Sequence, residues 1–306
     1  MKIRYNNFNQ EPVATIQAQN RPIYCFNTQL ELSNIDYSVV HSFGEEWKKF
    51  HEFSYAEIER SANKYFDILD EKMINENTYG IDIGCGTGRW TKYLLGKIGF
   101  MEALDPSDAI FVADKLLGKR ENVRLLRGST DNIPFNDQTF DFGMSIGVLH
   151  HIPNTQKAMN DCVKKIKLGG YFYTYLYYNL ENKGIIFKTL LSIVTRIRKK
   201  TSSLPPKPKK IVCELIAISV YMPFVFLGRL LKKIGLNSYA KKLPLSGYQT
   251  QSYFVIRNDA LDRFGTSLEQ RFSKADVEQM MRNAGLDEII ISDSSPFWHA
   301  VGKRVT

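Results

Sequence analysis

The stretch Tyr79-Gly-Ile-Asp-Ile-Gly-Cys-Gly-Thr-Gly-Arg-Trp90 constrains the fold of this chain more than any other segment. A short apolar run leads into Gly84, Gly86 and Gly88, and a helical pattern follows at once. Glycines at a sharp strand-to-helix turn can adopt positive φ and let a ligand approach the bare backbone, and the helix beyond begins with amide donors. The stretch therefore predicts a nucleoside-binding loop between a strand and a helix.

The spacing of the glycines narrows the class of ligand. A dinucleotide fingerprint, Gly-x-Gly-x-x-Gly, that began at Gly84 would need its third glycine where the chain has Arg89. A phosphate-binding loop would end in Gly-Lys-Ser/Thr, which this stretch lacks. The remaining pattern, Asp-x-Gly-x-Gly-x-Gly beginning at Asp82, resembles the first motif of the class I S-adenosylmethionine (SAM)-dependent methyltransferases.

A second short strand, Phe100-Met-Glu-Ala-Leu-Asp105, ends in an acidic residue one helix downstream of the loop. At that place Asp105 is suited to accept hydrogen bonds from both ribose hydroxyls of a nucleoside. Taken alone, an aspartate before Pro106 is better explained as a helix cap or turn residue. Together with the glycine loop, ribose binding is the better interpretation.

Further segments extend the resemblance over residues 75–178 in the same order. They are a third strand with an adenine loop at residues 123–135, a fourth strand at 139–153, and a helix with a fifth strand at 163–175. The resemblance implies an α/β fold: a Rossmann-like, seven-stranded, mostly parallel sheet with helices on both faces, an antiparallel last strand and an added helical insertion. It also implies cofactor contacts from Asp82, Gly84, Cys85, Gly86, Gly88, Asp105, Pro106, Ser129, Thr130, Asp131 and Gly147.

Two positions depart from the family pattern. The acid that often follows the glycine of the adenine loop is replaced by Ser129, so the adenine amino group would meet Asp131 or only backbone. The proline that usually precedes the Gly-Gly turn is Leu168, which is a mild change in a turn. Neither departure alters the expectation that SAM is the cofactor.

Length and composition leave room for more than this sheet. The 306 residues are 43% hydrophobic and 24% charged, enough for one domain with additions. The four cysteines lie far apart without a Cys-x-x-Cys pair, which argues against a zinc site and against a disulfide framework. Residues 1–7 are too polar to begin a signal peptide. We therefore expect a cytoplasmic protein without a bound metal.

The net charge of +9 is concentrated in one segment. Residues 181–250 contain fourteen Lys or Arg but only two acids, Glu181 and Glu214, so the rest of the chain is slightly acidic. A local basic face suits an anionic acceptor or surface and argues against general nucleic-acid binding.

The sequence predicts four regions along the chain. An N-terminal arm at residues 1–45, with an extended patch at 22–26, precedes the SAM-binding core at residues 46–180. A basic and hydrophobic helical insertion follows at residues 181–250, and residues 251–306 complete the core sheet.

Both ends of the core carry specific expectations. A helix beginning near Trp47 would put Trp47 and Phe50 either against a ligand or against the sheet, and burial preference favours the sheet. Residues 257–265 are expected to form a polar loop facing the cleft, residues 273–285 a helix capped by Ser273, and residues 289–302 a closing pair of strands.

The insertion contains an apolar run that has two interpretations. Its longest uncharged stretch, residues 215–228, has fourteen residues and is interrupted by Pro223. A spanning helix requires about eighteen or more, so the sequence does not predict a transmembrane segment. It predicts either a buried helical lid or, with the neighbouring lysines, a surface peripheral to the inner face of a membrane.

The catalytic candidates follow the fourth and fifth strands. Methyl transfer from a sulfonium mainly requires alignment of the acceptor, but an oxygen acceptor must also lose a proton. Histidine, with an unperturbed pKa of about 6.5, suits that role. His150 and His151 follow the fourth strand, and Tyr175 and Tyr178 follow the fifth. A histidine pair that only shapes the turn explains the same pattern.

We therefore expect a SAM-dependent methyltransferase that acts on oxygen of a small or carrier-linked anionic acceptor, such as a phosphate-bearing sugar or glycan intermediate. Methylation of a lipid-like or quinone-like acceptor at a membrane surface is the alternative within the enzyme class. A SAM-binding subunit without turnover is the alternative outside it, since the glycine loop and Asp105 indicate cofactor competence only. Nucleic-acid partners are not expected, because the chain lacks an Asn-Pro-Pro-Tyr motif.

Overall fold

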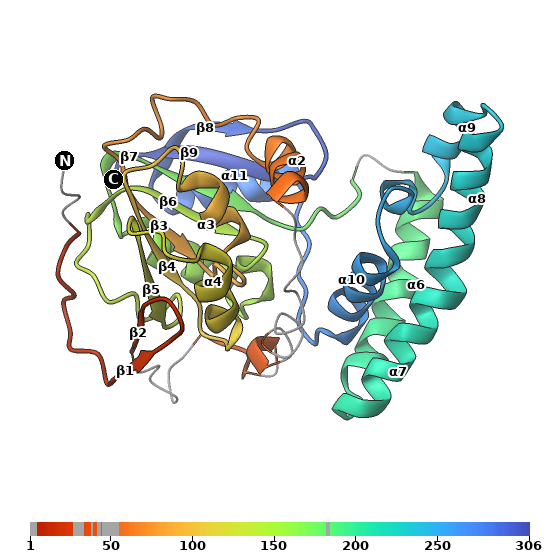
Figure 1. Ribbon diagram of the computed structural model, residues 1–306. Coiled ribbons are helices and arrows are strands. Elements are labelled where there is room, and N and C mark those ends of the chain that lie inside the picture. The colour runs from red at the N-terminus through yellow and green to blue at the C-terminus, as the bar shows by residue number, and fades with distance from the viewer. Residues whose placement is uncertain (1–4, 27–33, 38, 42–43, 45–54, 182–183) are drawn as a thin grey trace. The chain divides into compact units, whose positions relative to one another are not determined.

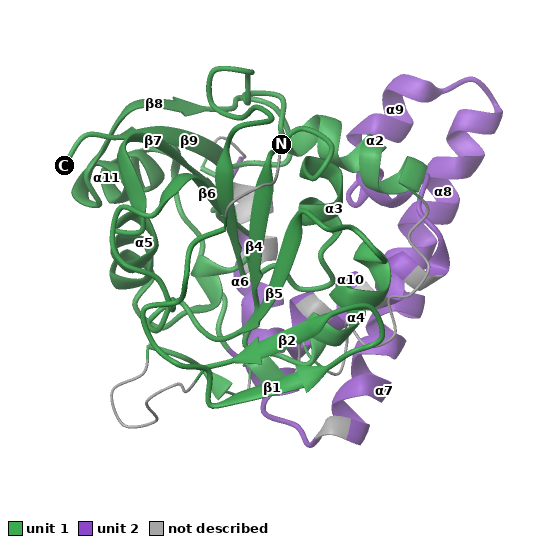
Figure 2. Ribbon diagram, turned by 60° about the vertical axis from the view of Figure 1, so that its left-hand side comes forward, with its two compact units in different colours: residues 1–181, 268–306 green, residues 182–267 purple. Residues whose placement is uncertain are grey.

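The computed structural model describes the chain except for residues 1–4, 27–33, 38, 42–43, 45–54 and 182–183 (Figure 1). Trp47 and Phe50, for which we expected a helix, lie outside the described residues. The chain divides into two compact units (Figure 2). Unit 1 comprises Met1–Glu181 and Leu268–Thr306, and unit 2 comprises Asn182–Ser267. The second unit thus extends to residue 267, beyond the expected end of the insertion at 250.

Unit 1 is built on one sheet with the strand order β1-β2-β5-β4-β3-β6-β7-β9-β8. The central strands run parallel, and β9 and β8 close the sheet in antiparallel pairing. The parallel central strands are β3 (Tyr79–Ile83), β4 (Phe100–Leu104), β5 (Val123–Arg127), β6 (Phe140–Ile146) and β7 (Ile166–Tyr175). The closing strands are β8 (Leu286–Ile291) and β9 (His299–Arg304). This confirms the predicted Rossmann-like α/β fold. The strand order reverses between β3 and β6, which is where such sheets bind ligands.

The sheet has nine strands because the N-terminal region adds two to the expected seven. β2 (Pro22–Cys25) pairs in parallel with β5, and β1 (Ala14–Gln17) folds back antiparallel on β2. Pro22 stands at the first residue of β2, where its missing N–H is tolerated. The turn between the two strands is anchored by Arg21, whose Nε lies 3.2 Å from Oδ1 of the buried Asp114.

Helices cover both faces of the sheet. α2 (Tyr55–Tyr65), α3 (Arg89–Leu94) and α4 (Ala109–Leu117) contribute to the apolar cluster on one face. α5 (Thr155–Val163) and α11 (Lys274–Asn283) contribute to the cluster on the other. The predicted capping box of α11 is present, with Ser273 and Asp276 bonding each other's backbone N–H. Every residue of β3 and β4 is buried, as expected for parallel strands covered on both faces.

A buried ion pair joins β4 to β5 near the N-terminal segment. Glu102 is fully buried, and Arg124 donates to its carboxylate through Nε (3.0 Å) and Nη2 (2.6 Å). The Tyr79 hydroxyl donates to the same carboxylate at 2.6 Å. Burial raises the pKa of Glu102, and the bonds from Arg124 and Tyr79 oppose that rise. The carboxylate therefore depends on Arg124 to stay ionised inside the protein.

Arg124→Ala is expected to lower the free energy of unfolding by about 3–5 kcal/mol, because it leaves a buried carboxylate without its partner. Urea denaturation measures the loss. Lys157→Ala, which breaks the exposed pair with Asp161 (2.7 Å), is the matched control and should cost less than about 1 kcal/mol. Equal losses in the two variants would contradict this account of the pair.

Unit 2 is helical throughout its described residues, apart from the connections. Its elements are α6 (Ile185–Ser202), α7 (Pro206–Ile216), the π-helical turn η2 (Ala217–Tyr221), α8 (Met222–Lys233), α9 (Asn237–Lys242), the 3-10 turn η3 (Ser246–Tyr248) and α10 (Tyr253–Gly265). Its core is the apolar cluster of Cys213, Ala217, Tyr221 and Val225 with Ile256, Ala260 and Phe264.

The prediction of a polar loop at residues 257–265 is wrong, because these residues belong to α10. Ser252 caps the helix by accepting a hydrogen bond from the Val255 N–H. Ile256, Ala260 and Phe264 recur every four residues and are buried on one side, while the polar residues between them hid this period in the sequence.

The expectation that Pro223 interrupts the apolar run is also wrong. α7, η2 and α8 form one continuous helix, Lys207–Lys233, which is long and apolar enough to cross a membrane as judged by length and composition. The Met222 N–H bonds to the Ala217 carbonyl five residues back, and this wider turn lets the chain continue through Pro223 in the first turn of α8. Only 28% of its most apolar window is buried.

Candidate functional site

The loop between β3 and α3 has the backbone that its glycines predicted. Gly84, Gly86 and Gly88 have φ values of 80°, 54° and 75°, which L-residues with side chains rarely adopt. A Cβ on Gly84 would lie 2.4 Å from Cγ2 of Val148, so this glycine permits close packing against the turn after β6. A Cβ on Gly86 would meet nothing within 4 Å. Gly86 therefore leaves its backbone open to a close approach by a ligand at the carboxyl end of the sheet.

Asp105 lies beside this loop at the end of β4. Its Oδ2 accepts a hydrogen bond from the Gly86 N–H (2.8 Å), and its Oδ1 accepts from the Ser107 N–H (2.8 Å) and hydroxyl (2.6 Å). Burial raises the pKa of Asp105, and these hydrogen bonds oppose the rise. A carboxylate has about four acceptor positions, so the group can still accept from a ligand. The structure thus brings Asp105 to the glycine loop, with Pro106 directly after it.

Asp82 ties β3 to α3 beneath the loop. Its Oδ2 accepts a hydrogen bond from the Thr91 hydroxyl at 2.5 Å, and the side chain is buried. Burial raises the pKa of Asp82 to about 7; the Thr91 bond opposes the rise and the charge of Asp105 adds to it. Burial likewise raises the pKa of the neighbouring Cys85, which keeps it a thiol. Sequence reasoning did not find Thr91, since a threonine inside a helix carries no recognisable signal.

The loop after β5 holds the three residues expected near adenine. The Ser129 hydroxyl donates to Oδ1 of Asp131, whose Oδ2 accepts from the Asn34 N–H at 3.2 Å. The Thr130 hydroxyl is buried and has no hydrogen-bond partner among the described residues. A buried polar atom without a partner is costly, so Thr130 is the member of this group that best fits a ligand contact.

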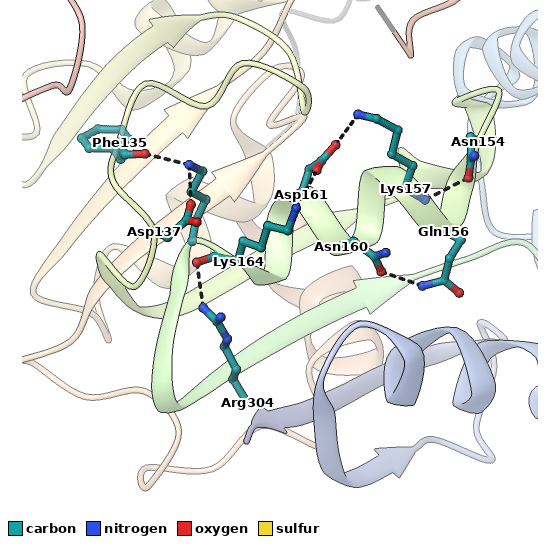
Figure 3. A network of polar contacts seen from close by, with 10 residues as sticks. Phe135, Asp137, Asn154, Gln156, Lys157, Asn160, Asp161, Lys164 and Arg304 are labelled. Carbon is teal, nitrogen blue, oxygen red and sulfur yellow. Dashed lines mark hydrogen bonds and ion pairs between the residues drawn. The ribbon is translucent and has the colours of Figure 1, made fainter. Parts of the chain in front are cut away.

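Thr130 and Asp131 also line an open groove of about 380 Å³ that runs toward the end of α5. Each of its two lysines lies near an acidic side chain. Lys165 Nζ bonds to the Phe135 carbonyl and to Asp137 Oδ1, each at 2.8 Å, which joins the end of α5 to the loop before β6. Lys164 Nζ lies 3.7 Å from Asp161 of α5, three residues back (Figure 3).

The turn after β6 carries the histidine pair. Gly147 (φ 78°) ends the strand, and the 3-10 turn η1 (Leu149–His151) follows. His150 is fully buried, and its ring stacks on that of Tyr177 with centroids 3.8 Å apart. Neither ring nitrogen of His150 has a hydrogen-bond partner among the described residues. Burial, together with His151 and Arg271, holds the pKa of His150 well below its ordinary value, so the ring is neutral near pH 7.

A distant segment supports this turn. The Gln270 N–H donates to the His150 carbonyl (2.9 Å), and His151 Nδ1 lies 2.7 Å from the Leu268 carbonyl. Arg271 pairs with Glu269 at 2.7 Å and lies 5.5 Å from the centre of the Tyr177 ring. Residues 268–271 carry no recognisable signal in the sequence, because they lie more than a hundred residues from the turn that they support.

The structure separates the two tyrosine candidates. Tyr175 lies near His150, with ring centroids 6.5 Å apart, and 5.8 Å from the ring of Tyr177. Tyr178 instead packs against Trp298 in the core, with centroids 5.4 Å apart. Residues 175 and 177 share one face of the extended chain and residue 178 takes the other. Tyr177, which also follows the fifth strand, is therefore the tyrosine that stacks on His150, and the catalytic roles expected of Tyr175 and Tyr178 stay predictions.

Within the part of the chain that the structure describes, no group of three or more His, Cys, Asp or Glu side chains could hold a metal ion.

Comparisons with known proteins identify the domain. Residues 81–174 match the family model described as a methyltransferase domain. The chain carries a class I SAM-dependent methyltransferase domain. SAM is accordingly the cofactor of this domain.

Curated relatives are similar to about a third of the chain. The demethylmenaquinone methyltransferase of Shouchella clausii (strain KSM-K16) is 29% identical over 111 residues, which is 34% of this chain and 47% of the relative. That of Staphylococcus aureus (strain JH9) is 30% identical over 108 residues, or 34% and 44%. The chain thus matches less than half the length of these relatives.

A solved structure shares the fold of this domain. It is human N-acetylserotonin methyltransferase in complex with SAM, with a TM-score of 0.50 and 11% identity. The match covers 86% of this chain and 57% of the human chain.

Asp82→Asn is expected to flatten the pH dependence of the unfolding free energy. Burial raises the folded-state pKa of Asp82 to about 7 from an ordinary 3.8, so the folded protein holds this proton more tightly than the unfolded chain does. The resulting stability is fully present below about pH 4 and is lost as the pH rises through 7. Between pH 5 and pH 8 the wild-type protein should therefore lose roughly 2–3 kcal/mol of unfolding free energy that the variant keeps.

Urea unfolding at the two pH values measures this difference. The titrating groups other than Asp105 and Cys85, which interact with Asp82 through charge, contribute alike in both proteins, so their contributions cancel in the comparison. Equal losses between pH 5 and pH 8 in wild type and variant would contradict the assignment to Asp82.

Proposed function

We propose that this protein is a SAM-dependent methyltransferase that methylates a hydroxyl oxygen of an apolar, lipid-like or quinone-like small molecule, with His150 as the general base. The observation that carries the proposal is the state of His150. Its ring is neutral and held by stacking on Tyr177, and both its nitrogens lack partners among the described residues. A bound acceptor hydroxyl would satisfy one of them.

The residues at the carboxyl end of the sheet fit the cofactor. A ligand can approach the backbone closely at Gly86, and Asp105 has a carboxylate for the ribose hydroxyls. The Thr130 hydroxyl is a polar group for the adenine of the cofactor. Bound SAM supplies a methyl group activated by the positive charge on sulfur. The fit rests on the open space at Gly86, which a side chain would fill.

His150 would take the proton from the acceptor hydroxyl as the new bond to oxygen forms. A neutral imidazole can accept a proton, and the stacking on Tyr177 fixes the plane of the ring without occupying either nitrogen. Because burial lowers the pKa of His150, the ring stays available as a base at pH values where an ordinary histidine is already protonated.

An uncharged acceptor fits the surroundings of His150 and Thr130 better than the phosphate-bearing acceptor that the net charge of the sequence suggested. Arg271, whose charge contributes to the lowered pKa of His150, is paired with Glu269 at 2.7 Å. The lysines of the groove beside Thr130 are paired as well. The printed names of the curated relatives, demethylmenaquinone methyltransferases, also support an apolar acceptor.

Asp105→Ala is expected to weaken SAM binding by about 1.5–3 kcal/mol, the range for hydrogen bonds to a charged group. Isothermal titration calorimetry measures the affinity. Asp108→Ala is the matched control, since Asp108 pairs with Arg127 (2.9 Å) three residues away and is partly exposed. Unchanged affinity in a folded Asp105→Ala protein would contradict the assignment of the cofactor site.

His150→Phe is expected to lower turnover by roughly 10²–10⁴-fold while SAM affinity stays the same, because it keeps the stacking but removes the base. Transfer of radiolabelled methyl from SAM to a short-chain quinol measures turnover, with a sugar phosphate as the anionic comparison. His151→Gln is the control and should retain most of the activity.

The pH profile gives an independent readout of the same base. The acid limb of kcat/KM should lie below pH 6.5, since the pKa of His150 is lowered. Methylation of the sugar phosphate alone would reject the apolar acceptor, and a fully active His150→Phe protein would show that the base lies elsewhere.

A further inference from the structure

The long helix of unit 2, Lys207–Lys233, has two apolar sides. The inner side carries Cys213, Ala217, Tyr221 and Val225, which are buried and recur every four residues. They form the core of unit 2 together with three side chains of α10. The apolar side chains of the inner side are therefore buried within unit 2. The remaining apolar surface of the helix lies on the opposite side.

The outer side is exposed along the whole helix. Its large apolar side chains are 42–68% exposed, with Phe226 the most exposed at 68%. They are Ile211, Leu215, Ile218, Val220, Phe226, Leu227 and Leu230, followed by Ile234, Leu236 and Tyr239 beyond the helix. Each such side chain gains about 1.5–3 kcal/mol on full burial, so a row of this length indicates a contact surface.

The outer side carries no charge over residues 215–228. Ser219 is the exposed polar residue there, and its hydroxyl donates to the Leu215 carbonyl at 2.6 Å, so its hydrogen bond is made within the helix. A helix that is apolar on all sides is normally buried on all sides. Unit 2 buries only the inner one.

Lysines flank this surface at both ends. Lys207, Lys209 and Lys210 lie at the start of the helix, and Lys232 and Lys233 lie at its end. Unit 2 as a whole has sixteen Lys or Arg and three Asp or Glu, a net charge of +13, whereas the rest of the chain sums to −4. The nearest members of the two lysine groups, Lys210 and Lys232, are separated by about 33 Å of helix at 1.5 Å per residue.

We propose that the outer side of Lys207–Lys233 is a docking surface for an anionic lipid bilayer, with the helix lying in the plane of the interface. A bilayer presents an apolar layer beside negatively charged headgroups, which matches an apolar stripe with lysines at its ends. The lysine stems can cover apolar surface while their ammonium groups reach the headgroups. A second copy of this chain would bring two strongly positive units together, so charge disfavours self-association.

The inner side of the helix favours docking over crossing. Tyr221 donates to Asp259 of α10 at 3.1 Å, and Glu214 lies 3.7 Å from Arg257. If the helix spanned the bilayer with its own core attached, these charged groups would enter the hydrocarbon layer, which is costly. In-plane docking leaves them on the side facing water. The inference stands independently of the proposed acceptor.

Flotation with vesicles tests the surface. The full-length protein is mixed with vesicles of 70% phosphatidylcholine and 30% phosphatidylglycerol, or of phosphatidylcholine alone, at about 150 mM salt. We expect co-flotation with the anionic vesicles and much less with the neutral ones. Replacing Lys207, Lys210, Lys232 and Lys233 by Gln should lower the partition coefficient about fivefold for each lysine removed.

Substitution of the apolar stripe tests the second part of the surface. Phe226→Ser with Leu230→Ser should reduce flotation at least tenfold. Val13→Ser with Leu168→Ser removes two apolar side chains of unit 1 that are 59% and 56% exposed, and this matched control should float like wild type. Equal losses in the two double variants would overturn the proposal.

Four other results would also overturn it. Absence of flotation on anionic vesicles would exclude the bilayer as occupant. Retention of the protein in the membrane after extraction at pH 11 would indicate that the helix spans the bilayer. A dimer in sedimentation, or a lower unfolding midpoint caused by Phe226→Ser with Leu230→Ser, would show that protein already covers the stripe.

Discussion

The hydrogen bond from the Gly86 N–H to Asp105 is the interaction on which the cofactor end of this sheet depends. It joins the loop after β3 to the end of the adjacent β4, so that two neighbouring strands present one continuous surface. The loop backbone has positive φ at three glycines, and such a loop keeps its shape only when its amides find partners. Asp105 supplies one partner and is itself fixed by Ser107. Burial strengthens this arrangement, since water cannot compete for the same atoms.

The acceptor side is organised by stacking rather than by hydrogen bonds. His150 lies between the end of β6 and the aromatic residues that follow β7, and the segment at residues 268–271 fixes its backbone from the far end of the chain. A histidine oriented by a ring keeps both nitrogens available, whereas one oriented by a carboxylate gives up one of them. The same burial that orients His150 also lowers its pKa, so position and protonation state have one physical cause.

Unit 2 contrasts with unit 1 in how its apolar surface is used. The strands of unit 1 are covered on both faces by helices, whereas the long helix of unit 2 is covered by its own unit on one side. The charge is divided in the same way, with +13 in unit 2 and −4 in the rest of the chain. A single partner, the anionic bilayer, accounts for both the apolar stripe and the concentration of lysines in unit 2.

The sequence alone determined the features that depend on local geometry. The glycine loop, the acid after the second strand, the alternation of strands and helices in the core and the capped helix α11 all follow from residue spacing within short windows. The sequence also predicted that His150 follows the fourth strand. It could not predict that the His150 ring stacks on that of Tyr177. These features are local because turns, caps and strand periods are set by φ/ψ preferences and by neighbours a few residues away.

The tertiary structure decided what depends on contacts between distant residues. Strands β1 and β2 join the sheet through pairing with β5, about a hundred residues away, and residues 268–271 reach the histidine turn over a similar distance. The helical form of α10 depends on burial of three of its side chains in unit 2. Tyr178 packs against Trp298, and it is Tyr177 that stacks on His150. Such outcomes depend on which surfaces meet in the folded chain, because burial and long-range pairing can override local propensity.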